Sequence, residues 1–376
     1  MVDFELSDDQ LALRDAARDL LDKRSSPERV RAHIEGAGPE RPSEREAQPY
    51  DRSLWEAMVE QGWLGIDLPE AQGGLGLGTV EAAVLGEELG RHLAPVPLTP
   101  SLLALGALAQ AAARGVAEAQ PWVDRLLGGE AVGCVAWSRS PGAVTAAESG
   151  GGWTLTGRAD PCVAAPVADV AVVPTAAGLF AVDLDATGTR PGAESAMDLT
   201  RPLGWLELDS TPALRLGGPE AVTAVVDHGA VVVSAELLGG AERVLEMTSQ
   251  YAKERVQFGR PIGSFQAVKH RCADMLVDVE GMRSTVYYAA WCIGAGHPDA
   301  SVAASTAKIW CADAAARVMA SGLQVHGGIG FTWEHDLHLY LKRSQLDQVT
   351  FGDAPWHRER LAGLLRPRVE AGDSVI

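Results

Sequence analysis

The chain lacks the features that mark secreted, membrane-bound or nucleic-acid-binding proteins. Its 376 residues include only five cysteines, scattered without a C-x-x-C pair, so we expect buried, reduced thiols. Positive charge is scarce, and the net charge of −18 argues against nucleic acid or an anionic membrane as the main partner. The N-terminus has no basic segment followed by an apolar one, and no apolar run reaches transmembrane length. These absences predict a cytoplasmic protein.

The patterns that are present divide the chain into three parts, in keeping with a length that exceeds one hydrophobic core. Helical spacing of apolar residues fills the first third. From about Gly129, short segments rich in Val and Thr alternate with turn residues, and from Ala230 the pattern is helical to the end. We therefore predict an α+β multidomain fold. It has an N-terminal helical domain (1–128), a middle β-barrel or sandwich (129–228) and a C-terminal four-helix bundle (229–376).

Local signals place several of these elements. Ser7 and Gln10 form a capping box, and Ser53 and Glu56 form a second box that opens a helix ending at Gly62. Residues 34–52 are rich in Pro, Glu, Arg and Gly and indicate a solvated loop. The predicted strands are residues 132–137, 153–157, 170–173 and 179–182.

The segment YAKERVQFGRPIGSFQ, residues 251–266, separates two long helical patterns. Gly259 and Pro261 break the helix, because glycine frees φ and proline lacks a donor. Lys253 and Arg255 are therefore expected in the last turn of the first helix. Two interpretations remain open: these cations satisfy the terminal carbonyls, or Arg255 reaches out to a phosphate.

Two glycine-rich segments raise the question of nucleotide binding. The first, residues 65–76, has G-x-G spacing, but a helix precedes it, whereas a dinucleotide fingerprint follows a strand. The second, residues 324–332, follows a helix and contains Gly327, Gly328 and Gly330. This loop could cap the helix or present backbone N–H groups to an anion, and one loop can do both.

A group of polar residues near the second loop raises a metal hypothesis. His335 and His338 are three apart on a predicted helix and could share a ligand. No third ligand stands at a familiar spacing, so we predict no metal site. The residues considered are His326, Glu334, His335, Asp336 and His338.

The pattern R-x-x-F-G-x-P-I-x-x-F-Q resembles the signature hairpin of the acyl-CoA dehydrogenase family, which uses FAD to desaturate acyl-CoA thioesters. The P-E-x-x-G-G-x-G segment and the glycine loop at 324–332 are similar to two further stretches of that family. The resemblance implies that this hairpin and loop clamp the adenosine diphosphate half of an FAD bound mainly by a neighbouring subunit. The implied cofactor-binding residues are Arg255, Phe258, Gln266, Gln324, Gly327 and Gly328.

The part of the family pattern that surrounds the flavin is missing. Two positions usually occupied by Trp and Thr fall on Pro161 and Val163, whose side chains cannot donate a hydrogen bond. The preceding segment, residues 136–141, is shortened relative to the family.

The catalytic glutamate is missing as well. The two places where family members carry it fall on Gly352 and Gly229. Asp353 and Asp227 lie close by, but each is a methylene shorter than glutamate, and proton transfer requires hydrogen-bond reach. We therefore interpret both aspartates as turn or capping residues.

These features predict the non-catalytic, β-type subunit of a heterotetrameric (α2β2) bacterial acyl-CoA dehydrogenase. The resemblance implies FAD as cofactor, a related chain as partner, an acyl-CoA substrate with a bulky steroid side chain, and an electron-transfer flavoprotein as acceptor. One alternative is a self-sufficient homotetramer that uses Asp353 as base. Another is a flavin-free scaffold that keeps the fold for assembly.

Overall fold

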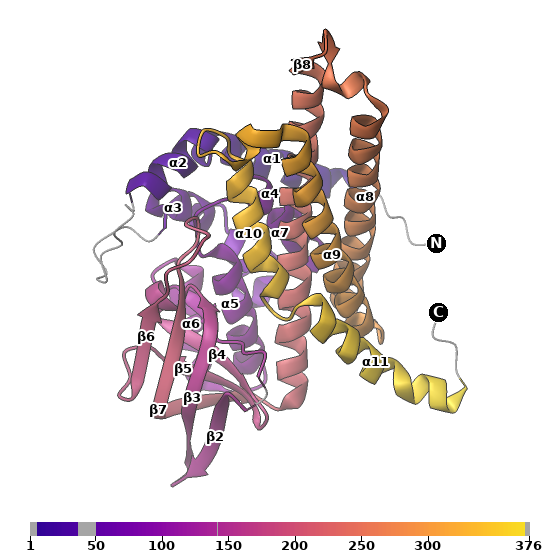
Figure 1. Cartoon of the computed structure of the whole chain (residues 1–376). Coiled ribbons are helices and arrows are strands. Elements are labelled where there is room, and N and C mark those ends of the chain that lie inside the picture. The colour runs from indigo at the N-terminus through magenta and orange to yellow at the C-terminus, as the bar shows by residue number, and fades with distance from the viewer. Residues whose placement is uncertain (1–5, 37–49, 141, 373–376) are drawn as a thin grey trace. The chain divides into compact units, whose positions relative to one another are not determined.

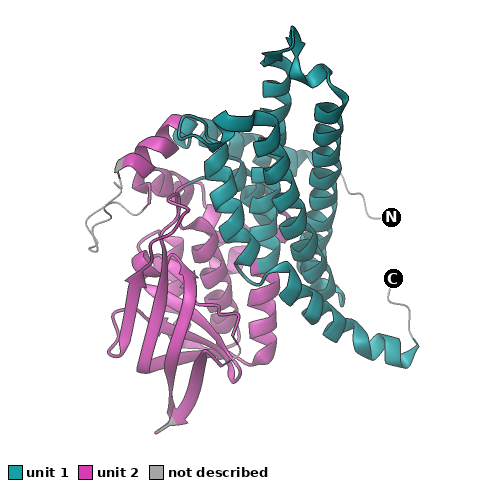
Figure 2. Ribbon diagram, viewed as in Figure 1, with its two compact units in different colours: residues 1–27, 82–94, 230–376 teal, residues 28–81, 95–229 magenta. Residues whose placement is uncertain are grey.

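The computed structural model describes residues 6–36, 50–140 and 142–372. Along the chain, helices come first, a β-sheet follows, and helices come again after it (Figure 1). This order confirms the predicted succession of helical, sheet and helical regions. Contacts group the chain into two units (Figure 2). The helical unit comprises residues 1–27, 82–94 and 230–376, and the sheet unit comprises residues 28–81 and 95–229. The domain boundaries at 128 and 228 stay a prediction.

Four α-helices of the sheet unit precede its strands. The predicted capping box at Ser53 is wrong in detail, because Asp51 is the N-cap of the helix Arg52–Glu60. The Asp51 carboxylate accepts a hydrogen bond from the Leu54 N–H at 3.0 Å. The helix Pro27–Gly36 was not predicted, and residues 37–49 of the expected loop lie outside the described residues. The four helices are α2 (Pro27–Gly36), α3 (Arg52–Glu60), α5 (Leu98–Ala113) and α6 (Gln120–Leu127).

Seven strands form one sheet in the order β1-β4-β5-β7-β3-β2, with β6 also paired to β7. Among the described residues of this sheet, β1 and β4 pair in parallel and the other ladders are antiparallel. Each predicted strand is confirmed, while β2, β6 and β7 were missed. The strands are β1 (Gly133–Val135), β2 (Val144–Ser149), β3 (Gly152–Val163), β4 (Val170–Thr175), β5 (Gly178–Asp183), β6 (Thr189–Ala193) and β7 (Leu203–Gly217).

Burial explains why this sheet forms. The first four residues of β4 and the first five of β5 are all buried, as expected of strands covered on both faces. Helix α5 lies against β1: the Ser101 hydroxyl is 3.1 Å from the Gly133 N–H, and a Cβ added at Gly133 would be 2.7 Å from that of Ala104. The five cysteines are free thiols and four of them are buried, as predicted.

In the helical unit, α9 packs against α8, α10 and α11. It also lies directly on α7, because a Cβ added at Gly322 would be 2.7 Å from Val244 Cγ1. The capping box at Ser7 is confirmed. The helices that end or lie in this unit are α1 (Asp8–Arg24), α4 (Thr79–Arg91), α7 (Pro219–Glu254), α8 (Gln266–Gly294), α9 (Ala300–His326), α10 (Leu337–Val349) and α11 (Ala354–Ala371).

Helix α7 starts at Pro219, earlier than the Ala230 suggested by the sequence. By length and composition it could cross a membrane, since one 18-residue window has a mean hydropathy of 1.6. This corrects the expectation that no apolar run reaches that length. Seventy-eight per cent of the window is buried inside the protein, as in a core helix.

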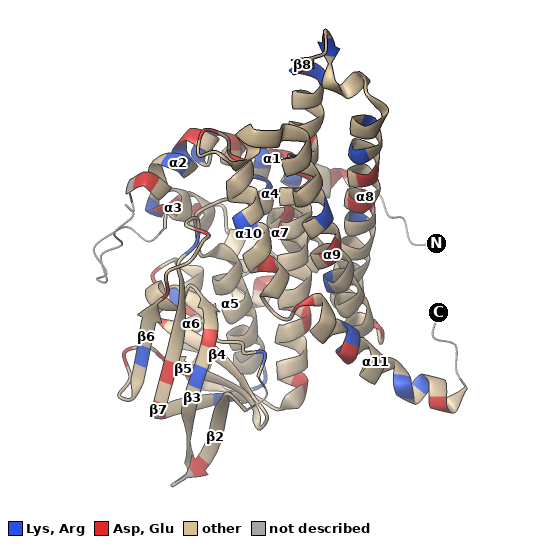
Figure 3. Cartoon of the chain, viewed as in Figure 1, with Lys and Arg blue, Asp and Glu red and all other residues tan. Residues whose placement is uncertain are grey.

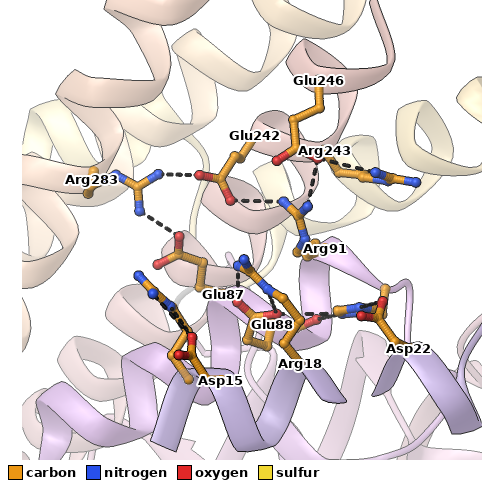
Figure 4. Close-up of polar contacts among 12 residues, drawn as sticks. Asp15, Arg18, Asp22, Glu87, Glu88, Arg91, Glu242, Arg243, Glu246 and Arg283 are labelled. Carbon is orange, nitrogen blue, oxygen red and sulfur yellow. Dashed lines mark hydrogen bonds and ion pairs between the residues drawn. The ribbon is translucent and has the colours of Figure 1, made fainter. Parts of the chain in front are cut away.

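Ion pairs tie four helices of the helical unit together (Figure 4). Arg283 on α8 donates to Glu87 on α4 and to Glu242 on α7, both at 2.6 Å. Burial lowers the pKa of Arg283, but Glu87 and Glu242 outweigh it and raise the pKa overall. Arg18 on α1 makes a bidentate contact with the fully buried Glu88 of α4. The network thus holds α1, α4, α7 and α8 in register.

Candidate functional site

The segment predicted to interrupt the helices is a β-hairpin. Helix α7 ends at Glu254, and β8 (Val256–Gln257) pairs with β9 (Arg260–Pro261). Phe258 and Gly259 form the two-residue turn with φ of 52° and 75°, the left-handed pair that a type I′ turn requires. The Phe258 side chain is 91% exposed. The hairpin therefore presents an exposed aromatic ring at its tip, edge-on to the Phe265 ring with centroids 6.0 Å apart.

Arg255 follows directly after α7 rather than lying in its last turn, and its N–H donates to the Tyr251 carbonyl at 2.8 Å. Its side chain is exposed and forms no ion pair with any described residue. Nearby Arg260 stacks on Phe265, 4.2 Å from the ring centroid. Basic residues gather around β8 (Figure 3). Arg255 is thus an exposed cation with its charge available to an anion.

The glycine loop begins where α9 ends, at His326. Residues Gly327–Phe331 form a short 3-10 helix, and Gly327 has φ of 64°. A Cβ added at Gly327 or Gly328 would meet no atom within 4 Å, so the backbone here is open to close approach. Gln324 on α9 and Gln266, the first residue of α8, are both exposed.

The structure brings the hairpin and the glycine loop together at their bases. The rings of Tyr251 and His326 are stacked with centroids 4.5 Å apart. Tyr251 lies one turn before Arg255, and His326 directly precedes Gly327. The two segments that were predicted to clamp a nucleotide therefore leave the helices side by side.

The first expected base position is closed. Gly352 has φ of 102°, and a Cβ added there would lie 2.6 Å from the Trp356 ring and 3.0 Å from His357 Nε2. Asp353 is the N-cap of α11, and its Oδ1 accepts a hydrogen bond from the Trp356 N–H at 2.9 Å. Rings fill the space that a glutamate side chain would need, and Asp353 has the capping role expected of it.

Two buried side chains that sequence reasoning missed hold this closed turn. Lys308 is fully buried and its ammonium donates to the carbonyls of Asp347 and Gln348, at 2.8 and 3.0 Å, at the end of α10. Burial lowers the pKa of Lys308 to about 8, against the opposing effect of Asp347. The His357 Nε2 donates to the Phe351 carbonyl at 2.9 Å, and burial lowers the pKa of His357 to about 3. Only the spacing of Lys308 among small apolar residues of α9 could have hinted at this role.

The second expected base position, Gly229, lies inside α7. Asp227 is buried in the interior of the same helix, so the interpretation of Asp227 as a turn or capping residue is wrong. The neighbouring His228 was not singled out from the sequence; its Nε2 is 3.1 Å from Asp67 Oδ2. His228 also lines a cavity of about 20 Å³ between α5, β5, β7 and the start of α7, which has room for about one water molecule. This cavity is therefore too small to hold an acyl thioester.

Comparisons with known proteins agree with this geometry. Residues 7–130 match the family model "Acyl-CoA dehydrogenase, N-terminal domain", and residues 217–364 match "Acyl-CoA dehydrogenase, C-terminal domain". Acyl-CoA dehydrogenase IpdE2 of Mycobacterium tuberculosis is 36% identical over 335 residues, which cover 88% of this chain and 89% of the relative. The chain belongs to the acyl-CoA dehydrogenase family.

Two solved structures have the same fold. The ChsE4-ChsE5 complex from Mycobacterium tuberculosis matches with a TM-score of 0.87 and 33% identity, covering 97% of this chain and 99% of the matched one. A variant of the Tcur3481-Tcur3483 steroid ACAD also matches at 0.87, with 32% identity and coverage of 96% and 99%. Family membership confirms the predicted fold, and FAD is the cofactor of this family.

The residues of this acyl-CoA dehydrogenase fit one half of FAD and not the other. Around Arg255, Phe258 and Gly327 there is an exposed cation, an exposed ring and open backbone, which suit a diphosphate and its nucleoside. In the sheet unit, Pro161 is exposed on β3 and Val163 ends that strand, so neither side chain can bond a flavin ring. Of the shortened segment before them, Pro141 lies outside the described residues.

The histidines near the glycine loop contact other rings. His335 precedes α10 and only His338 lies on it, so the two do not share a helix face as predicted. The His335 ring meets that of His326 at 4.6 Å, and His338 meets Trp333 at 4.5 Å. Among residues 6–36, 50–140 and 142–372, no three His, Cys, Asp or Glu side chains converge as a metal site requires.

Proposed function

We propose that this chain is the non-catalytic subunit of a heteromeric acyl-CoA dehydrogenase, and that it holds the adenosine diphosphate half of an FAD whose flavin lies in a related partner chain. The observation that carries the proposal is the closed turn at Gly352, which follows the far end of α10 from the glycine loop, together with the open hairpin and glycine loop. A chain that acted alone through this position would need a carboxylate side chain there, with open space around it.

Each clamp residue has a role that its exposure permits. The Arg255 guanidinium would pair with the diphosphate, the N–H groups of Gly327 and Gly328 would approach it closely, and Phe258 would cover an apolar face of the nucleoside. Gln266 and Gln324 would hydrogen-bond its polar edges. FAD held in this way would supply the hydride acceptor that desaturation of an acyl thioester needs. None of these side chains is a base, so the α-proton must go to a carboxylate of the partner.

The assembly and substrate follow from the similar structures. Each solved relative carries the names of two chains, and ChsE4-ChsE5 is a complex, which supports a related partner chain; the α2β2 stoichiometry is part of the proposal. One of them is a steroid ACAD, which supports a bulky steroid side-chain thioester as substrate class. An electron-transfer flavoprotein as acceptor and a cytoplasmic location remain parts of the same proposal.

Flavin content tests the proposal. The chain is purified alone and with its partner, and bound FAD is measured by its absorbance. We expect a colourless lone chain and a yellow complex. Arg255→Ala should weaken FAD binding by the complex roughly tenfold to a hundredfold, the scale of hydrogen bonds to a charged group. Arg260→Ala is the matched control, because that hairpin arginine stacks on Phe265.

The same measurements separate the alternatives. Stoichiometric FAD in the lone chain, bleached by an acyl-CoA substrate, would overturn the proposal and favour a self-sufficient homotetramer. Asp353→Asn should then abolish turnover. A flavin-free scaffold would instead be indifferent to Arg255→Ala in every assembly.

A further inference from the structure

The stacked rings of Tyr251 and His326 join the roots of the two clamp segments. Their planes are 22° apart and their centroids 4.5 Å apart. Each ring is one step from a group proposed to bind the nucleotide. Arg255 donates its N–H to the Tyr251 carbonyl, and Gly327 is the next residue after His326. The backbone segments that carry the two rings therefore also carry the clamp residues.

The His326 ring is held in one orientation and one tautomer. Its Nδ1 lies 2.8 Å from the Gly322 carbonyl, which can only accept, so Nδ1 carries the proton. Its Nε2 has no hydrogen-bond partner among the described residues, and the side chain is only 4% exposed. Burial lowers the pKa of His326, in opposition to the Gly322 bond. A neutral ring fixed in this way provides a firm face for the phenol of Tyr251.

The packing of the two segments varies around this stack. A Cβ added at Gly322 of α9 would lie 3.3 Å from Thr248 Oγ1 of α7, and one added at Gly330 would lie 3.1 Å from His326 Cβ. Gly259, Gly327 and Gly328 would each place a Cβ in open space. The stack is therefore a contact between α7 and α9 that lies next to the open backbone of Gly327.

We infer that the Tyr251–His326 stack is a positioning device that sets the separation between the Arg255 guanidinium and the Gly327–Gly328 backbone, so that both can engage one nucleotide diphosphate together. The inference rests on the proposed function of this chain. It concerns binding and not chemistry, because neither ring belongs to the residues proposed to contact the nucleotide.

Apparent FAD affinity of the deflavinated complex is the test, measured by quenching of flavin fluorescence on titration. Tyr251→Leu should weaken binding roughly tenfold, the upper end expected for an aromatic pair. Tyr251→Phe keeps the ring and should restore affinity to within about twofold. At saturating FAD, kcat of Tyr251→Leu should equal that of the unchanged complex. Tyr288→Leu is the control, because Tyr288 stacks on Trp291 elsewhere in the helical unit.

The outcomes distinguish the positioning role of the Tyr251–His326 stack from the proposed binding of FAD by this chain. If Arg255→Ala weakens FAD binding and Tyr251→Leu does not, the stack has no positioning role and the proposed function stands. Equal weakening by Tyr251→Leu and Tyr251→Phe, or by Tyr288→Leu, would also overturn the inference. If neither Arg255→Ala nor Tyr251→Leu changes FAD affinity, the proposed function itself fails.

Discussion

The glycine loop after α9 and the turn between α10 and α11 both contain a glycine with positive φ, but the space beside the two glycines differs. Gly327 and Gly352 both have positive φ, 64° and 102°. Beside Gly327 there is open space, whereas beside Gly352 two aromatic rings stand within 3.0 Å of an added Cβ. A left-handed glycine thus marks a bend in the chain, and only the neighbours of that bend decide between a binding surface and a packed core.

The strongest way to break this contrast is to force a glutamate into the closed turn. Gly352→Glu must adopt a left-handed backbone and displace Trp356 and His357, so we expect a loss of about 4 kcal/mol in the free energy of unfolding. The variant should gain no dehydrogenase turnover as a lone chain. Denaturant unfolding and a flavin bleaching assay measure the two effects.

Gly363→Glu is the matched control for that substitution. Gly363 lies on α11, is exposed, and would place a Cβ in open space. A glutamate there should leave stability unchanged or raise it by about 0.5 kcal/mol, because glycine is a poor helix former. A fully stable Gly352→Glu variant, or one with turnover, would show that the turn is not closed.

Replacing the buried Lys308 should destabilise the end of α10 that leads into the same turn. Lys308→Met leaves the carbonyls of Asp347 and Gln348 without their donor, and we expect a loss of about 3 kcal/mol. The exposed Lys269→Met on α8 should cost less than about 0.5 kcal/mol. Equal midpoints of urea unfolding for the two variants would contradict the role given to Lys308.

The buried His357 should make the closed turn sensitive to acid. In the unfolded chain His357 takes up a proton near its ordinary pKa of 6.5, but in the folded protein only near 3. Unfolding therefore binds about one extra proton between these values, and stability falls as the pH falls below 6.5. The loss should reach about 2 kcal/mol at pH 5. His357→Phe should flatten this part of the stability–pH curve, and an unchanged slope would refute the assignment.

The smallest stability effect is expected at the open clamp. Arg255→Ala removes an exposed side chain without an ion pair among the described residues, so the free energy of unfolding should change by less than about 0.5 kcal/mol. Its large effect should appear only in FAD retention. A substantial shift in thermal unfolding of the flavin-free chain would mean that Arg255 is part of the scaffold.

Periodic patterns in the sequence were sufficient for the order of the fold, because they reflect which faces are buried. Strands such as Val170–Thr175 stand out as runs of Val between turn residues. The β7 strand did not, because it carries charged and polar residues between its buried ones and pairs with β3, β5 and β6 at once. The α2 helix was obscured by its polar composition.

The candidate site was predictable where a local motif defines it and hidden where long-range packing does. Spacing placed Arg255 and the glycine loop at the ends of helices, and only their resemblance to family motifs implied a nucleotide clamp. Lys308 lies 39 residues from Asp347, and nothing in either segment announces their contact. The filling of the Gly352 turn is local in sequence, since Trp356 and His357 lie at the start of α11, but Gly352 and the nearby rings were not connected in the sequence analysis.

The exposed Phe258 ring has a consequence for the production of this protein. A side chain that is 91% exposed leaves its apolar surface in water until a neighbour covers it. If the proposed partner chain covers this ring, co-production of the two chains should give more soluble protein than production of this chain by itself.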